Sequence, residues 1–396
     1  MHPANALKCS KSEKLKDRRI VLGVTGSIAA VESVKLCREL IRHGAEVHVV
    51  MSADAQKILH PYALEFASGR PVTTEIDGRV QHVALCGSVT DRVDMLLIAP
   101  ATANTISKIA CGIDDTTVTT FATTALGTGI PVMVVPAMHG SMIRHKIVLR
   151  NIDCLKDLGV IVLDCSLDEA KAKMPSTDEI VAKTISRAGR GDMRGVKVLV
   201  IAGSTEEPLD DIRVLTNRSS GETGVELAKA AYERGADVEL WMGRCGVAIP
   251  SYLTTKRFST AVELEGMIDD KAGADIVLFP AAVSDYRPDR YNGKMPSTND
   301  TVTLTLSKTP KLVDKVVGAT VVAFKAQSRA QESQLVQEAV ELIERAGCSF
   351  AVANRMEDVE RGMTRALIVE RDGSVEEVSG SKAAVAEKIL DRSLKG

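Results

Sequence analysis

The sequence predicts two doubly wound α/β domains in one chain, each a mainly parallel sheet with helices on both faces. Three observations predict this fold class. The chain has 396 residues, which is enough for two domains with separate cores. Continuous apolar runs such as Ile20–Val24 alternate with helical patterns, and such runs are typical of parallel strands buried on both faces. The same order of elements also begins twice, near residues 19 and 195.

The repeat consists of a strand, a turn of small residues, a helix and a second strand. The first copy reads "RRIVLGVTGS" and closes with "RHGAEVHVVM", and the second reads "RGVKVLVIAGS" and closes with "ERGADVELWM". Further on, "DMLLIAPATANT" (94–105) and "ADIVLFPAAVSDY" (274–286) each lead from an acidic residue through a strand to Pro-Ala. The expected organisation is an N-terminal extension (1–18), a first domain (19–188), a linker (189–194) and a second domain (195–396).

One segment of the second domain has a different pattern. Residues 301–307, "TVTLTLS", alternate polar and apolar side chains, which is typical of a half-exposed strand. We expect this strand to join the second sheet in antiparallel orientation.

Composition excludes several classes of protein. The net charge is −2 and no apolar run approaches the roughly 20 residues of a membrane helix, so we expect neither nucleic acid nor membrane as a partner. Residues 1–19 are polar and basic without an apolar centre, unlike a secretory signal. The 8 cysteines show no C-x-x-C pair or zinc spacing, which predicts reduced thiols in a cytoplasmic protein.

Ligands of open parallel sheets bind beyond the carboxyl ends of the strands. In the first domain these turns read "GVTGSIAA" (23–30), "MSADA" (51–55), "APATANT" (99–105) and "PAMHGSM" (136–142). The first turn is neither a G-x-G-x-x-G nor a P-loop sequence. A ligand with a single phosphate, such as FMN, fits it as well as a plain tight turn does. His139, taken alone, is more typical of a hydrogen-bonded loop residue than of a catalyst.

The motifs also carry a family resemblance. "GVTGSIAA", "QHVAL" (81–85), "PATANTISKIACGI" (100–113) and "PAMHGSM" resemble the flavin-dependent cysteine decarboxylases. "AGSTEEPLDDIRVLTNRSSGETG" (202–224), "PAAVSDYRP" (280–288), "KTPKLV" (308–313) and "VAFKAQS" (322–328) resemble phosphopantothenate–cysteine ligases. In this order, over about residues 20–380, they resemble the bifunctional coenzyme A biosynthesis family. The resemblance implies a flavodoxin-like domain followed by a Rossmann-like ligase domain.

For the first domain, the resemblance implies FMN-dependent decarboxylation of 4′-phosphopantothenoylcysteine to 4′-phosphopantetheine. Oxidation of the substrate CH₂–SH group by FMN to a thioaldehyde would place the carboxylate β to C=S, so that CO₂ can leave, and the reduced cofactor would then return the hydride. His82 would act as the base. His139 stands where the family usually has an Asn that holds the substrate carboxylate, and its imidazole can also donate a hydrogen bond. Cys165 would be a proton donor on a substrate flap, although a buried structural thiol is nearly as consistent with its poorly matching surroundings.

The remaining residues that the resemblance assigns in the first domain bind cofactor or substrate. The FMN contacts would be Gly26, Ser27, Ser52, Thr102 and Asn104. The substrate contacts would be Met138, His139, Lys173 and Met174. The resemblance also implies a homo-oligomer built from trimers, such as a dodecamer, with the flavin between subunits.

For the second domain, the resemblance implies ligation of cysteine to 4′-phosphopantothenate. CTP with Mg²⁺ would convert the carboxylate into an acyl-cytidylate, which the cysteine amine then attacks. Asn217 and Lys294 would be catalytic, and Asn217 and Arg218 would contact substrate. The CTP contacts would be Asp285, Lys294, Lys308, Lys311, Phe324 and Lys325. The sequence departs from the family at Pro296, where a basic residue is usual, and at Glu222–Thr223, where Lys-Met is usual. The sequence does not indicate which residues would bind the metal ion.

Two alternatives stay open on the sequence alone. One half could be inactive or act on another substrate, such as a peptide with a C-terminal cysteine. A flavodoxin-like electron carrier fused to a nucleotide-binding module is the other alternative. Carriers usually place FMN between aromatic rings, whereas the single tryptophan, Trp241, lies in the second half of this chain.

Overall fold

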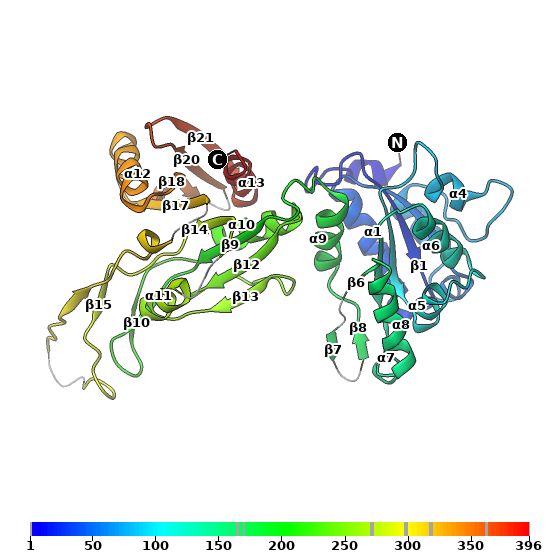
Figure 1. Cartoon of the computed structure of the whole chain (residues 1–396), viewed down its shortest axis with the longest axis horizontal. Coiled ribbons are helices and arrows are strands. Elements are labelled where there is room, and N and C mark those ends of the chain that lie inside the picture. The colour runs from blue at the N-terminus through cyan, green and yellow to red at the C-terminus, as the bar shows by residue number, and fades with distance from the viewer. Residues whose placement is uncertain are drawn as a thin grey trace. The chain divides into compact units, whose positions relative to one another are not determined.

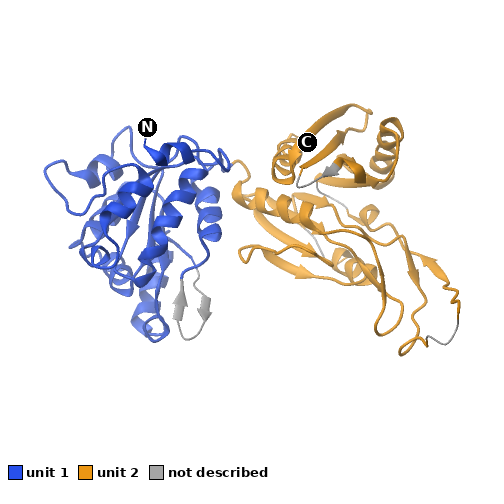
Figure 2. Cartoon of the chain, turned by 180° about the vertical axis from the view of Figure 1, so that it is seen from behind, with its two compact units in different colours: residues 1–191 blue, residues 192–396 orange. Residues whose placement is uncertain are grey.

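The computed structural model describes residues 2–163, 166–168, 171–269, 273–296, 300–316, 320–360 and 363–395, with the backbone alone at 166–168, 171–173 and 359–360. The chain forms two compact units, residues 1–191 and 192–396 (Figures 1 and 2). Each unit has a parallel sheet between helices, which confirms the predicted α/β class. Within the described part of the chain, no helix is long and apolar enough to cross a membrane.

Unit 1 is built on a five-stranded parallel sheet in the order β2-β1-β3-β4-β6. Numbered by themselves, its strands run 2-1-3-4-5, the flavodoxin-like order. In the first strand of the chain, which is second in this order, Ile20 pairs with Val47 on one side and with Met95 on the other. The strands are β1 (Arg19–Val24), β2 (Glu46–Met51), β3 (Met95–Ala101), β4 (Val132–Pro136) and β6 (Ile161–Val162).

Helices cover both faces of this sheet because its strands are apolar on both faces. Apolar side chains of α1, α3 and α9 form one core, and those of α5, α6 and α8 form the other. The helical elements are η1 (Pro3–Leu7), η2 (Ile28–Glu32), α1 (Ser33–Arg42), α2 (Ala53–Gln56), α3 (Pro61–Ser68), α4 (Gln81–Cys86), α5 (Ala103–Ala110), α6 (Thr117–Gly127), α7 (Gly140–Ile143), α8 (Lys146–Asp157) and α9 (Thr177–Ala188).

A small antiparallel sheet stands at the end of β4. It has the order β5-β8-β7, with β5 (Met138–His139), β8 (Lys171–Lys173) and β7 (Ser166–Asp168). Met138 pairs with Ala172, and His139 pairs with Lys171. The segment after β4 is therefore joined to a hairpin that lies some thirty residues later in the chain.

The N-terminal segment, expected as an extension at residues 1–18, packs against unit 1. Leu15 is fully buried in the core that contains α1 and α3, and η1 packs against both helices. The Ser12 hydroxyl lies 2.7 Å from Nδ1 of His43, and Lys11 forms an ion pair with Glu39. Because an apolar residue lies in the polar stretch "KSEKLKDRR", the segment gains burial that its average composition does not reveal.

Unit 2 has a nine-stranded sheet in the order β13-β12-β9-β14-β17-β18-β20-β19, with β21 paired to β20. The first six strands are parallel and, numbered by themselves, run 3-2-1-4-5-6, the Rossmann order. The strands are β9 (Lys197–Ala202), β12 (Asp237–Met242), β13 (Thr254–Arg257), β14 (Ile276–Phe279), β17 (Thr320–Gln327), β18 (Phe350–Arg355), β19 (Val359–Glu360), β20 (Met363–Val369) and β21 (Val375–Ser381).

Helices again form layers on this sheet. Helices α10 and α13 pack together over one apolar core, and α11 and α12 contribute to the others. The helical elements are α10 (Glu222–Glu233), α11 (Ala261–Asp269), η3 (Leu312–Lys315), α12 (Glu332–Ala346), η4 (Met356–Asp358) and α13 (Lys382–Ser393).

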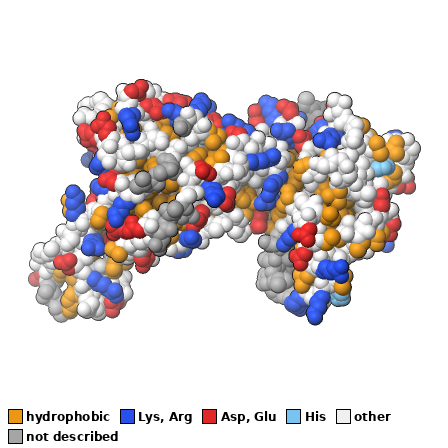
Figure 3. Space-filling view, viewed as in Figure 1, with side chains coloured by type: hydrophobic (Ala, Val, Ile, Leu, Met, Phe, Trp, Pro, Cys, Tyr) orange, Lys and Arg blue, Asp and Glu red, His pale blue; other side chains and the backbone are white. Residues whose placement is uncertain are grey.

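Two short ribbons stand apart from this sheet, and they correct one expectation. They are β10 (Glu206–Pro208) with β11 (Val214–Thr216), and β15 (Tyr286–Pro288) with β16 (Leu306–Lys308). The predicted strand at 301–307 is wrong in extent and in partner, since only its end lies in β16 and pairs with β15. The apolar side chains of residues 301–307 are exposed. Hydrophobic patches are visible in Figure 3 on the part of unit 2 that contains β15 and β16. The antiparallel additions to the main sheet are instead β19, β20 and β21.

The start of unit 2 takes in part of the predicted linker. Met193 is fully buried in the core beneath α10 and α13. Asp192 accepts hydrogen bonds from the buried Arg234, with the shorter at 2.6 Å. Residues 192–193 thus belong to unit 2, which leaves a shorter connection than the sequence suggested.

Candidate functional site

The carboxyl edge of the unit 1 sheet is held together by one threonine. Thr25 follows β1, and its hydroxyl donates to the Pro100 carbonyl at 2.8 Å and accepts from the Thr102 N–H at 3.0 Å. The Ser52 N–H also donates to the Val24 carbonyl at 3.0 Å. The turns after β1, β2 and β3 are therefore fixed to one another, as expected for a site at the ends of parallel strands.

Three of the predicted FMN contacts begin helices at this edge. Ser27 caps η2, Ser52 caps α2 and Thr102 caps α5, each through a side-chain oxygen that accepts a backbone N–H. Asn104 lies exposed in the first turn of α5. At Gly26, a Cβ atom would lie 2.5 Å from the Cβ of Asp54 in α2, so only glycine fits there.

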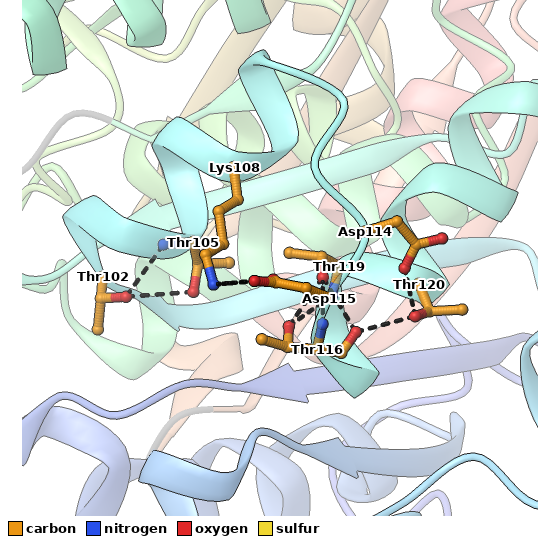
Figure 4. A network of polar contacts seen from close by, with 8 residues as sticks. All are labelled: Thr102, Thr105, Lys108, Asp114, Asp115, Thr116, Thr119 and Thr120. Carbon is orange, nitrogen blue, oxygen red and sulfur yellow. Dashed lines mark hydrogen bonds and ion pairs between the residues drawn. The ribbon is translucent and has the colours of Figure 1, made fainter.

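A polar network between α5 and α6 holds α6 beside the carboxyl edge of the unit 1 sheet (Figure 4). Nζ of Lys108 lies 2.8 Å from both carboxylate oxygens of Asp115, and Asp114 accepts from the Thr120 hydroxyl. The Thr117 hydroxyl, in the first turn of α6, donates to the Met51 carbonyl at the end of β2 at 2.7 Å. These contacts place the N-terminus of α6 among the turns.

His82 lies in α4, which packs against α6. Its ring centroid is 6.4 Å from that of Phe121 in an edge-on arrangement. Of all buried side-chain polar atoms in the described residues, only His82 Nδ1 and Thr309 Oγ1 have no hydrogen-bond partner. A buried nitrogen without a partner costs free energy.

His139 caps α7 at the end of β4. Its Nδ1 accepts from the Ser141 N–H at 3.3 Å and lies 2.8 Å from the Ser141 hydroxyl. Because Nδ1 accepts, the ring proton is assigned to Nε2, and the side chain is exposed. His145 caps α8 in the same way, by accepting from the Ile147 N–H at 3.2 Å. Capping by itself therefore does not distinguish His139 from His145.

The predicted substrate contacts around the hairpin are only partly placed. Met138 is half-buried beside His139 in β5, which pairs with β8 of the hairpin. Met174 follows β8 and packs against the core on the α1 face, not toward His139. Cys165 lies outside the described residues, and so does the side chain of Lys173. The β5–β8 pairing nevertheless joins the predicted flap to the His139 segment.

Unit 2 has a cavity of about 640 Å³ where the strand order reverses, between β9 and β14. Ligands of doubly wound sheets bind at this switch point. Five of the predicted residues line the cavity together: Asn217, Arg218, Asp285, Phe324 and Lys325. An amide N–H of the Asn217 side chain donates to the Ala282 carbonyl at 3.0 Å, which fixes Asn217 to the loop after β14.

The glycine turn after β11 brings α10 to the cavity wall. At Gly224, a Cβ atom would lie 2.1 Å from the Cβ of Ala202, so glycine allows α10 to approach β9. Gly221 precedes α10 with φ +73°, in the left-handed region. Both glycines line the cavity, with Ser219 and Ser220 between Arg218 and the helix.

A second cavity, of about 440 Å³, shares Asp285, Phe324 and Lys325 with the first and adds Lys311. Its lysines are in ion pairs: Lys311 with Asp285, and Lys325 with Glu338 at 2.9 Å. Hydrogen bonds from Gln327 and Lys325 lower the pKa of Glu338. Two of the predicted cations, Lys311 and Lys325, are therefore already paired with carboxylates beside the cavities.

Lys294 and Lys308 do not belong to the residues that line these two cavities of the described chain. Lys308 lies exposed in β16, and Lys294 lies exposed in a loop that contacts the β10–β11 turn. Within the described ranges, no group of three or more His, Cys, Asp or Glu side chains could hold a metal ion.

Two residues at these sites, Thr25 and Lys382, were not predicted from the sequence. Thr25 lies within "GVTGSIAA", but its bonds to neighbouring turns depend on the order of the strands in the sheet. Lys382, the first residue of α13, lines the 640 Å³ cavity and forms an ion pair with Glu222 of α10. No local motif marks Lys382; the acidic Glu222 at an unusual position was the one available signal.

Known proteins match the chain in both halves. Residues 8–189 match the flavoprotein family, and residues 193–395 match the DNA/pantothenate metabolism flavoprotein C-terminal domain family. The coenzyme A biosynthesis bifunctional protein CoaBC of Thermococcus kodakarensis is 44% identical over 99% of this chain and 98% of that protein. The same protein of Methanocaldococcus jannaschii is 35% identical over 99% of this chain and 97% of its own. A solved structure of the CoaBC C-terminal domain is 26% identical, covers 52% of this chain and 96% of its own, and has a TM-score of 0.43.

The matches define a class first: a two-domain flavoprotein of pantothenate metabolism. The chain belongs to the family of coenzyme A biosynthesis bifunctional proteins, since the relatives match it over nearly their whole length. It is a bifunctional enzyme with a flavoprotein decarboxylase domain followed by a ligase domain. The family resemblance seen in the motifs is confirmed.

Proposed function

We propose that unit 2 joins cysteine to 4′-phosphopantothenate at the expense of CTP, and that unit 1 decarboxylates the product to 4′-phosphopantetheine. The observation that carries the proposal is the cavity at the β9–β14 switch point, which gathers Asn217, Arg218, Asp285, Phe324 and Lys325 from separate segments. For unit 1, support comes from the three joined turns and from the pairing of the His139 segment with the flap hairpin.

In unit 1, the capped turns would hold FMN. Gly26 and Ser27 would contact its phosphate, with Ser52, Thr102 and Asn104 nearby, because neutral hydroxyl, amide and N–H donors suit a single phosphate and a flavin edge. When bound, FMN supplies the hydride acceptor that decarboxylation of an amino-acid carboxylate requires. His82 would remove a proton from the substrate thiol, and its buried Nδ1 without a partner is consistent with a ligand nearby.

His139 would hold the substrate carboxylate. Its Nδ1 is occupied by the Ser141 N–H, so the neutral ring presents Nε2–H as a donor. An Asn side chain offers the same kind of neutral N–H donor, which explains how histidine could serve in its place. Met138, Lys173 and Met174 remain proposed substrate contacts, and Cys165 remains a proposed proton donor.

In unit 2, the cavity would hold CTP and 4′-phosphopantothenate. Phe324 would contact the base, and Asp285, Lys308, Lys311 and Lys325 would contact the ribose and phosphates. Lys311 and Lys325 would exchange their carboxylate partners for phosphate oxygens on binding. Mg²⁺ would be held mainly by the triphosphate and water, because this ion usually takes only one or two protein carboxylates.

The catalytic steps of the ligase fall to two residues in this proposal. Asn217, held by its bond to Ala282, would orient the acyl-cytidylate as the cysteine amine attacks. Arg218 beside it would contact the phosphorylated substrate. Lys294 would neutralise charge that develops during transfer, and because its loop lines neither cavity, it would act at the cavity of a second copy of the chain.

We also propose a cytoplasmic homo-oligomer built from trimers, such as a dodecamer, that acts on small molecules. Exposed apolar side chains at Ile28, Val31 and Val83 of unit 1 are consistent with association. The cysteines of the described chain are all free, which is consistent with a reducing compartment.

The proposal is tested by adding the substrates of each reaction separately. The purified protein should form 4′-phosphopantothenoylcysteine from 4′-phosphopantothenate, cysteine, CTP and Mg²⁺, as measured by mass. It should also convert added 4′-phosphopantothenoylcysteine to 4′-phosphopantetheine without CTP. Failure of one reaction would reject the proposal for that unit alone.

A further inference from the structure

A buried carboxylate closes the turn between β10 and β11. Asp210 is 3% exposed. Its Oδ1 accepts from the Ile212 N–H at 2.8 Å and from the Arg213 N–H at 2.6 Å. Bonds to residues two and three positions later are those of an ordinary Asx turn, and a structural role would require no more than these.

The second oxygen of Asp210 reaches a distant segment. Oδ2 accepts from the Met295 N–H at 3.1 Å and from Nη1 of Arg213 at 2.7 Å. The same Nη1 donates to the Met295 carbonyl at 3.3 Å. On the other side of Lys294, the Gly293 carbonyl accepts from the Asp211 N–H at 3.3 Å. Both neighbours of Lys294 are therefore tied to this turn, whereas the Lys294 side chain is exposed.

The charge of Asp210 is preserved despite burial. Burial alone would raise its pKa, but the N–H groups of Ile212, Arg213 and Met295 and the charge of Arg213 lower the pKa to about 2. Asp210 is therefore ionised throughout the neutral range, and its lone pairs are taken by these donors. A carboxylate in this state is suited to holding backbone and not to exchanging protons.

We propose that Asp210 is a positioning residue of the ligase reaction, which fixes the Gly293–Met295 loop and thereby the point from which Lys294 extends. The inference rests on the proposed function of unit 2, since it concerns the lysine assigned to that reaction. The inference assigns Asp210 an effect on the reaction that is exerted through Lys294, without contact between Asp210 and the substrate.

The first test does not depend on activity. Trypsin cleaves after lysine, and the Lys294–Met295 bond contains the N–H that Asp210 accepts. Proteolysis requires local opening. In the full-length protein, Asp210→Asn should increase the cleavage rate at this bond about tenfold. Asp211→Asn is the matched control, because Asp211 lies in the same turn, is exposed and pairs with Arg290 at 3.0 Å. Equal cleavage rates in wild type and Asp210→Asn would overturn the inference.

The second test measures the reaction. Asp210→Asn should lower ligase kcat about 10- to 100-fold, the loss expected for hydrogen bonds to a charged group, with little change in KM for CTP. Asp211→Asn should leave both unchanged, and decarboxylation by unit 1 should be intact in both variants, which reports on folding. In a Lys294→Gln background, which removes the cation, Asp210→Asn should cost less than about twofold, because groups that act as a unit are not additive.

The outcomes separate this inference from the proposed function. A wild-type chain that forms no 4′-phosphopantothenoylcysteine would reject the function of unit 2. An active wild type with an unchanged kcat in Asp210→Asn would reject the positioning role alone. Full additivity of the Asp210 and Lys294 effects would also reject it, since Asp210 would then act independently of Lys294.

Discussion

Units 1 and 2 place their sites at the same point of similar sheets but build them from different side chains. In unit 1, the turns that follow the strands are joined by neutral groups, with Thr25 bonded to Pro100 and Thr102. In unit 2, the cavities are lined by lysines and carboxylates in pairs, such as Lys311 with Asp285 and Lys382 with Glu222.

The difference follows the ligands that each unit is proposed to take. A flavin with a single phosphate is held by N–H groups and hydroxyls at helix starts, whereas a triphosphate beside a phosphorylated substrate needs several cations. In a chain of net charge −2, the lysines Lys311, Lys325 and Lys382 are paired with carboxylates, and under the proposed function an anionic ligand would replace those carboxylates. The shared architecture therefore fixes where each site lies, and the side chains at the strand ends fix its chemistry.

Replacing His82, the proposed base of unit 1, should have the largest effect. His82→Asn should lower decarboxylation about 100-fold or more, the usual contribution of general base catalysis. Ligation in unit 2 should be unchanged, because the variant alters neither cavity. Product masses after addition of 4′-phosphopantothenoylcysteine report the loss, and the flavin absorbance controls for folding. Decarboxylation at the wild-type rate would remove His82 from the proposed site.

A smaller effect separates function from helix capping at His139. His139→Ala should slow decarboxylation about 10- to 100-fold, because a hydrogen bond to a charged carboxylate is lost, and FMN should stay bound. His145→Ala is the matched control, since His145 caps α8 as His139 caps α7. Equal activities of the two variants would indicate that His139 is only a cap.

The smallest effect sharpens the description of unit 2. Lys382→Met should raise KM for CTP about tenfold, because it removes a cation and leaves Glu222 unpaired beside the cavity. The double variant with Glu222→Gln should recover part of the loss. Lys388→Met, on the exposed side of the same helix, is the control. If the two lysine variants share one KM, the Lys382–Glu222 pair only joins α10 to α13.

The strand core was predictable from sequence because its pattern is local. Apolar runs at Ile20–Val24 and 94–101 became β1 and β3, and the turns after them became helix caps. By contrast, the burial of Leu15 and the short extent of β16 depend on partners elsewhere in the chain. Alternation at 301–307 indicates which side chains share a face, but not whether a sheet edge is available to them.

The site residues divide in the same way. Asn217, Arg218 and Asp285 were found through motifs, and they meet in one cavity. Thr25 and Lys382 act across the fold, and the bond from Met295 to Asp210 joins residues 85 positions apart. No window of sequence contains such a pair, so the contacts that support a site could be found only once the chain was folded.

The central claim is that one chain carries two separable sites acting in sequence. The most direct test incubates His82→Asn, Asn217→Ala and their mixture with 4′-phosphopantothenate, cysteine, CTP and Mg²⁺, and follows product masses. We expect that His82→Asn accumulates 4′-phosphopantothenoylcysteine, that Asn217→Ala forms neither product, and that the mixture reaches 4′-phosphopantetheine. If each variant lost both reactions, or if the mixture stopped at 4′-phosphopantothenoylcysteine, the assignment of one reaction to each unit would be contradicted.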